Sequence, residues 1–194
     1  MRQGRIMLVA TALAVVGLTG PVATANAATL GYDHTYWSPD GLQLKFTASP
    51  GKADNLRVDW TQLSAPQPVG NSWYLSFSDG SDVITPASYN SVDNQATLTE
   101  CVFTLLTATC PDSASQTEIH LGDGNDSATV DLAGRPFVYG FPRDIDVYGD
   151  DGNDTIQAND GVLESVACGA AGNDVAIVDS SDVVNADCEH VVVK

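Results

Sequence analysis

The chain has 194 residues and is strongly acidic: 25 Asp and Glu residues oppose 8 Lys and Arg residues, for a formal net charge of −17 at pH 7. Such a charge repels nucleic acids and anionic membranes, so we expect neither as a partner. Charge alone also fits a merely solubilising surface. The acidic residues recur in turns, however, and that pattern favours binding of a hard cation.

The first residues have the features of a secretory signal peptide. Arg2 and Arg5 precede an apolar run over residues 6–18, and Ala25-Asn26-Ala27 has the small-x-small pattern of a cleavage site. The run is shorter than the roughly 20 residues that span a bilayer, so we predict no membrane span. Residues 1–27 are predicted to be removed, leaving residues 28–194 as a single secreted, extracellular domain.

Four cysteines in an exported chain are most simply two disulfides. Three pairings are possible, and the most local one joins Cys101 to Cys110 and Cys168 to Cys188. A metal site at these cysteines is disfavoured, because no Cys-x-x-Cys motif occurs and hard carboxylates dominate the chain.

Short β-prone runs broken by Gly, Asp, Asn, Ser and Pro predict an all-β domain. No stretch after the apolar run has helical periodicity, and several runs alternate in period two, as at Leu42, Leu44 and Phe46. The predicted strands are residues 42–47, 56–60, 73–77, 96–106, 118–121, 128–132, 137–139, 145–148, 162–166, 175–178 and 188–193.

Most aromatic residues lie before residue 80, in a segment of degenerate turns that we place at residues 28–118. We expect them to fill and cap the N-terminal end of the core, since aromatic side chains are chiefly core material. The alternative is an exposed stripe that stacks on carbohydrate. The residues concerned are Tyr32, Tyr36, Trp37, Phe46, Trp60, Trp73, Tyr74 and Phe77.

Three Gly-Asn-Asp turns, at residues 124–126, 152–154 and 172–174, recur in the C-terminal half. Each fits a nine-residue frame with Gly at the fourth place, Asp at the sixth and an aliphatic residue at the eighth. Asp54 and Asp82 fit the same register, at uneven spacings. These repeats predict a right-handed parallel β-helix or β-roll solenoid with irregular turns; an ordinary β-sandwich is the alternative.

The nine-residue frame resembles the hemolysin-type calcium-binding repeat, also called the RTX repeat, over roughly residues 121–177. The closing stretch from Cys168 to Cys188 resembles the terminal turn of small secreted bacterial members, and we take residues 119–194 as the calcium-repeat segment. The resemblance implies bound Ca²⁺. The implied side-chain ligands are Asp126, Asp154 and Asp174, and the implied backbone ligands are Gly149, Asp151, Gly169, Ala171 and Asp123.

The chemistry of the frame supports this interpretation. Glycines let the backbone fold tightly and turn carbonyl oxygens inward, and the sixth-place Asp adds a charged oxygen. Calcium takes six to eight oxygens, so two stacked turns are needed, and Asp154 with Asp174 is the most plausible pair for one or two ions. The alternative is that these residues only accept hydrogen bonds from turn amides, without metal.

We predict that the protein is not an enzyme. His34, His120 and His190 lie in no recognisable metal or nucleophile motif, and no Gly-x-Ser-x-Gly sequence occurs. Calcium is expected to be mainly structural, in a protein with a binding or surface-structural role whose cell-surface or carbohydrate partner is unknown. The alternative is a small polysaccharide lyase or hydrolase that uses tryptophans as a sugar platform.

Overall fold

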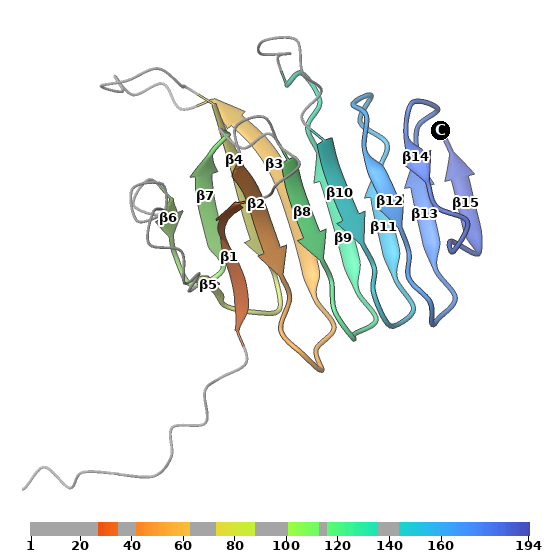
Figure 1. Cartoon of the computed structure of the whole chain (residues 1–194), viewed down its shortest axis with the longest axis horizontal. Helices are drawn as coiled ribbons and strands as arrows, with labels where there is room; N and C mark the ends of the chain where they lie inside the picture. Colours follow the sequence, from red (N-terminus) through yellow and green to blue (C-terminus); the bar gives the residue numbers. More distant parts are fainter. Residues whose placement is uncertain (1–26, 35–41, 63–72, 88–100, 113–115, 136–143) are drawn as a thin grey trace, which may run out of the picture.

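The computed structural model describes residues 27–34, 42–62, 73–87, 101–112, 116–135 and 144–194, which contain β-strands and no helix (Figure 1). Apart from residue 27, the predicted signal peptide lies outside these residues. So do the predicted strand at 137–139 and the side chains of Trp37 and Trp73.

The strands form two sheets. The first sheet has seven strands in the order β14-β12-β10-β8-β2-β1-β5, and the second has eight in the order β15-β13-β11-β9-β3-β4-β7-β6. The strands are β1 (Ala28–His34), β2 (Leu42–Thr47), β3 (Asn55–Gln62), β4 (Trp73–Asp79), β5 (Ile84–Pro86), β6 (Val102–Phe103), β7 (Thr107–Pro111), β8 (Gln116–His120), β9 (Ser127–Asp131), β10 (Asp144–Tyr148), β11 (Thr155–Ala158), β12 (Ser165–Ala167), β13 (Val175–Val178), β14 (Val183–Val184) and β15 (His190–Val193).

From β8 onward the chain alternates between the two sheets. Even-numbered strands join the first sheet and odd-numbered strands join the second, and neighbours within each sheet are parallel. Figure 1 shows these strands following one another towards the C-terminus, which lies beside β14 and β15.

The prediction of a parallel β-helix or β-roll solenoid is wrong, because both sheets are mixed. In the N-terminal half β1 pairs with β2, β3 with β4, β4 with β7 and β6 with β7, all antiparallel. The physical reason is that a Gly- and Asp-rich turn marks where the chain changes direction. It does not decide whether the next strand pairs parallel or antiparallel, which depends on packing of the whole sheet. The expectation of an all-β domain agrees with the structure.

Alternate side chains along each strand point into one hydrophobic core. In β11, for example, Ile156 and Ala158 are buried while Thr155 and Gln157 are exposed. This period-two pattern is what a strand with one buried face requires.

The aromatic residues of the N-terminal half that the structure describes are largely core residues. Tyr32, Phe46 and Phe77 are fully buried, and the rings of Phe46 and Phe77 stack with centroids 6.1 Å apart. Trp60 is half-buried against the same core. The expectation that aromatic side chains fill this end of the core is confirmed for these residues.

Two disulfides join Cys101 to Cys110 and Cys168 to Cys188, the local pairing. Disulfides persist in oxidising compartments and are rare in the cytosol, so the pair indicates a compartment outside the cytosol. In the part of the chain that the structure describes, no helix has the length and apolar character needed to cross a membrane.

Candidate metal centre

Four aspartates line up where turns of the first sheet lead into strands of the second. Asn55, Ser127, Thr155 and Val175 are neighbours in register across β3, β9, β11 and β13. The residue before each of them is therefore also aligned. These aligned residues, which we call the Asp column, are Asp54, Asp126, Asp154 and Asp174.

A ladder of hydrogen bonds holds the Asp column. In each step the backbone N–H of one aspartate donates to the carboxylate of the next residue in the column, and Glu189 closes the series. The donor–acceptor distances are 2.6 Å from Asp54 to Asp126, 2.8 Å from Asp126 to Asp154, 2.8 Å from Asp154 to Asp174 and 2.9 Å from Asp174 to Glu189. One oxygen of each acceptor is therefore used to satisfy a buried amide of the preceding turn.

The remaining oxygens of the Asp column are buried and have no hydrogen-bond partner. They are the Oδ2 atoms of Asp126, Asp154 and Asp174 and both carboxylate oxygens of Asp54. The four residues are at most 3 % exposed. A buried ionised carboxylate without a compensating partner is strongly unfavourable, so these oxygens call for a proton or a cation.

The pKa values of Asp54 and Asp154 are raised, as expected for buried carboxyls that lack such a partner. Burial, together with the nearby carboxylates of Asp79 and Asp126, raises the pKa of the Asp54 carboxyl to about 7. Burial also raises the pKa of Asp154 to about 6, although the hydrogen bond from the Asp126 amide opposes the shift. A divalent cation among these groups would favour their ionised forms and lower the pKa of each.

Backbone oxygens crowd the same turns. A Cβ on Gly152 would collide with the carbonyl oxygen of Gly124, and one on Gly172 would collide with that of Gly152. The same Cβ positions would lie 3.2 Å from Oδ1 of Asp154 and 3.0 Å from Oδ1 of Asp174. Carbonyl and carboxylate oxygens thus gather in one small region, which is the donor set that calcium prefers.

Gly152 gives a direct test of this close stacking. We expect Gly152→Ala to lower the free energy of unfolding by roughly 3 kcal/mol, because φ is +145° and the added methyl meets backbone. Gly134→Ala is the matched control: φ is +80°, but nothing lies within 4 Å, so about 1 kcal/mol is expected. Urea denaturation measures both. Equal losses in the two variants would contradict tight stacking of the turns.

The implied ligands divide into two groups. The structure brings together Asp126, Asp154 and Asp174, and a Cβ on Gly149 would lie 2.8 Å from Oδ2 of Asp154. The carboxylate of Asp123 instead accepts a hydrogen bond from the backbone of Gly51.

The other implied backbone ligands lie in the stacked turns. Asp151 and Ala171 face each other across an isolated parallel bridge. The Ala171 carbonyl accepts the Gly152 N–H at 2.9 Å. Gly169 lies against the backbone of Asp150.

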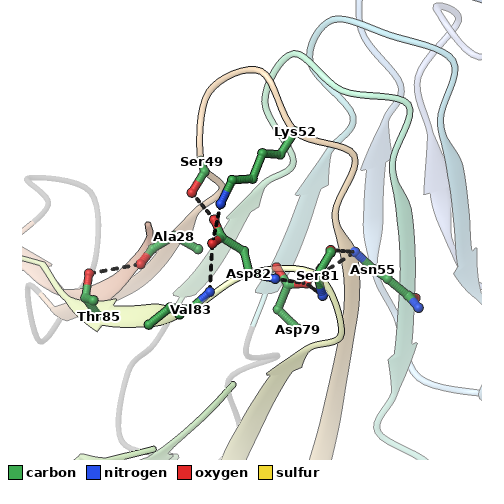
Figure 2. A network of polar contacts seen from close by, with 9 residues as sticks. All are labelled: Ala28, Ser49, Lys52, Asn55, Asp79, Ser81, Asp82, Val83 and Thr85. Carbon is green, nitrogen blue, oxygen red and sulfur yellow. Dashed lines mark hydrogen bonds and ion pairs between the residues drawn. The ribbon is translucent and has the colours of Figure 1, made fainter. Parts of the chain in front are cut away.

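Asp82, which shares the sequence register of the turns, lies outside the hydrogen-bonded ladder. Its carboxylate accepts hydrogen bonds from Lys52 Nζ, at 2.6 Å, and from the hydroxyl of Ser49 (Figure 2). Lys52 and Ser49 therefore supply the partners that the Asp column lacks. The pKa of Asp82 is lowered, because these bonds outweigh its burial.

Asp79 is a candidate ligand that the sequence motif did not indicate. It ends β4 and faces Leu56 across the antiparallel β3–β4 pair, which brings it near Asp54. Its Oδ1 accepts hydrogen bonds from Ser81, at 2.8 Å from both the amide and the hydroxyl (Figure 2). Its Oδ2 is buried without a partner. Asp79 stands at the third place of the frame that contains Asp82, as Asp123 and Asp151 do in other copies, but only the strand pairing places it near Asp54.

Among the described residues, no three His, Cys, Asp or Glu side chains converge into a ready-made metal site. A cation in the Asp column would therefore combine carboxylates of neighbouring turns with backbone oxygens.

Comparisons with protein-family models, curated proteins and solved structures give no match for this chain.

Proposed function

We propose that this protein is a secreted calcium-binding protein in which the Asp column holds Ca²⁺, as the resemblance to hemolysin-type repeats implies. One observation carries the proposal: four aligned, buried aspartates each retain at least one oxygen without a hydrogen-bond partner. The two disulfides support an oxidising environment outside the cytosol. Calcium sites of extracellular modules have dissociation constants of roughly 10⁻⁴ to 10⁻³ M.

Calcium in this position has a structural role. The Asp column joins turns that follow β2, β8, β10 and β12, so an ion between two turns ties neighbouring strands of both sheets together. Asp154 and Asp174 remain the best pair for one ion. Asp54, Asp79 and Asp126 provide a second group of carboxylates with free oxygens. We therefore propose one or two ions and a non-enzymatic binding or surface-structural role.

Calorimetric titration with calcium tests the proposal. Asp154→Asn is the informative variant, because the amide oxygen of Asn can still accept the Asp126 N–H while the ligand charge is removed. We expect at least about tenfold weaker binding, since ligand charge tunes calcium affinity. Circular dichroism in parallel confirms that the variant is folded.

Asp131→Asn is the control for charge. Asp131 lies on the outer face of β9 and pairs with Arg57 at 3.0 Å, so its removal deletes the same charge at the surface. We expect nearly wild-type affinity from this variant. Absence of binding in the wild-type protein, or equal weakening in both variants, would refute a specific site in the Asp column.

A further inference from the structure

The large apolar side chains that stay exposed gather at the two ends of the molecule. Figure 1 shows β6 at one end and β14 and β15 at the other, and these three are edge strands. Among the residues that the structure describes, Leu163, in the turn before β12, is the one exception. The exposed side chains are Val83, Val102, Leu105 and Leu106, which we call the hairpin tip, and Val183, Val191, Val192 and Val193, which we call the β15 end. Exposed apolar groups that gather in this way mark contact surfaces.

The hairpin tip is held in a fixed position. A disulfide joins Cys101 to Cys110 across the base of the β6–β7 hairpin. In the turn of the hairpin, the Leu105 carbonyl accepts the N–H of Ile84 at 3.1 Å, which brings Val83 to the same region. The Leu105 side chain is nevertheless 74 % exposed. An apolar group that is already ordered loses little conformational entropy on binding, so the tip is suited to a contact.

The hydrophobic core is uncovered at the β15 end. Val191 and Val193 are neighbours in register of Ala176 and Val178, which are buried in the core. Neighbours in register point to the same face of a sheet, so Val191 and Val193 also face the core. They are nonetheless 46 % and 60 % exposed. The terminal layer of a stacked β structure needs a cover over such side chains.

The backbone of β15 is also open on its outer side. The amides of His190 and Lys194 donate to carbonyl oxygens of Asp174 and Val178, at 3.0 and 2.9 Å. Alternate residues of a parallel strand bond to the same neighbour, so the intervening amides of residues 191 and 193 point away from β13. No other strand of the described part of the chain pairs with β15 on that side. An edge of this kind can accept another chain.

Charge decides which end can meet the β15 end. Residues 83–87 and 101–111, around the hairpin tip, include no charged side chain. Residues 179–194 include four acidic side chains, of which Glu189 is exposed, against the single cation Lys194. Contact between two β15 ends would bring these like charges together, in a chain whose formal net charge is already −17. A hairpin tip adds no charge to them.

We propose that the hairpin tip of one copy covers the β15 end of the next, so that this protein associates head to tail with itself. Each copy then covers both of its apolar ends, whereas contact between two hairpin tips would leave Val191 and Val193 exposed. Contacts between opposite ends of a molecule repeat from copy to copy, so the assembly is a chain and not a closed dimer. No aspartate of the Asp column takes part, so the proposal does not rest on calcium binding there.

Sedimentation velocity of the protein, in 10 mM calcium and from about 10 μM to about 1 mM protein, tests the association. A tip of four apolar side chains covers less than the roughly 800 Å² per partner of a standard interface, so we expect a dissociation constant of about 0.1 mM. The weight-average mass should then be about twice that of the monomer at about 0.1 mM protein. It should continue to rise above two at higher concentration.

Variants blocked at one end distinguish head-to-tail association from contact between like ends. Leu105→Asp blocks the hairpin tip and Val193→Asp blocks the β15 end, and each alone should stay monomeric. An equimolar mixture should form one-to-one pairs and nothing larger, because each variant keeps the end that the other lacks. Circular dichroism checks that both are folded. Val192→Asp, on the outer face of β15 beside Ile177, is the second variant if Val193→Asp does not fold.

Two control variants should associate like the wild-type protein. Gln157→Asp adds the same charge on the exposed face of β11, away from both ends. Asp154→Asn alters the Asp column, so its association is expected even where calcium binding fails.

Three results would overturn the proposal. The first is a wild-type protein that stays monomeric up to about 1 mM. The second is a variant blocked at one end that still dimerises, which would mean contact between like ends. The third is monomeric protein that binds phosphatidylcholine vesicles and loses this binding in Leu105→Asp, which would assign the hairpin tip to a lipid surface.

Discussion

Excess chelator is expected to lower the melting temperature of this protein by about 5–10 °C relative to 10 mM calcium. A ligand that binds only the folded state stabilises it by RT ln(1 + [L]/Kd), or about 2.7 kcal/mol at one hundred times Kd. For a chain of this size, each kcal/mol shifts the midpoint by roughly 2–4 °C. The physical source is relief of repulsion among buried carboxylates such as Asp54, Asp126 and Asp154.

Thermal unfolding followed by circular dichroism measures this effect. Magnesium at the same concentration is the control for ionic strength, because its small octahedral shell suits a site of stacked carbonyls poorly. The Asp154→Asn variant should show a smaller calcium-dependent shift than Asp131→Asn. An equal midpoint in calcium and in chelator would rule out calcium as a stabilising ligand of the fold.

The second large effect is a pH dependence of the metal-free protein. We expect its free energy of unfolding to fall as the pH rises from about 5 to about 9. The pKa values of Asp54, Asp154 and Glu164 are raised in the folded state, from 3.8 to about 7, from 3.8 to about 6 and from 4.5 to about 9. In that interval the folded state holds more protons than the unfolded state, so rising pH favours unfolding.

Each of the three carboxyl groups contributes to this pH dependence over its own pH interval. Each group contributes at most about 1.4 kcal/mol per pH unit, between its unfolded and folded pKa values. Asp154 ceases to contribute near pH 6 and Asp54 near pH 7, which leaves Glu164 between about 7 and 9. Glu164→Gln should therefore remove the pH dependence of the free energy of unfolding above pH 7. Glu118→Gln is the control, because it removes the same charge from β8, where Glu118 pairs with Lys45 at 3.4 Å, and it should leave this dependence unchanged.

Urea denaturation at several pH values, in chelator, measures these slopes. Saturating calcium should flatten those of Asp54 and Asp154, because the ionised carboxylates are then the bound form. A free energy of unfolding that stays constant from pH 7 to 9 in chelator would contradict a buried, neutral Glu164.

Some strand bounds and turn positions were predicted correctly from the sequence. The strand bounds predicted for β2 and β13 agree with the structure, and the Gly-Asn-Asp turns lie directly before β9, β11 and β13 as expected. Such features depend on a few adjacent residues: glycines where φ is positive, and Asn or Asp where turn amides need acceptors.

Contacts between residues that are far apart in the sequence could not be predicted from it. The antiparallel pairing of β3 with β4 places Asp79 near Asp54, and no local pattern announces that contact. Glu164 is a sharper case. The apolar run at residues 162–166 predicts a strand, yet β12 begins at Ser165. Leu163 is 41 % exposed, whereas the charged Glu164 is buried.

The hydrogen-bond ladder of the Asp column has a consequence for how this chain tolerates insertions. Its four steps join residues that are 72, 28, 20 and 15 positions apart in sequence, yet each uses the same amide-to-carboxylate contact. Each turn aligns its own aspartate with the next one in the column. The number of residues between two turns can therefore vary without moving the carboxylates. We therefore expect the opposite connections to tolerate insertions and deletions, whereas a one-residue insertion between a turn glycine and its aspartate would move a carboxylate out of line.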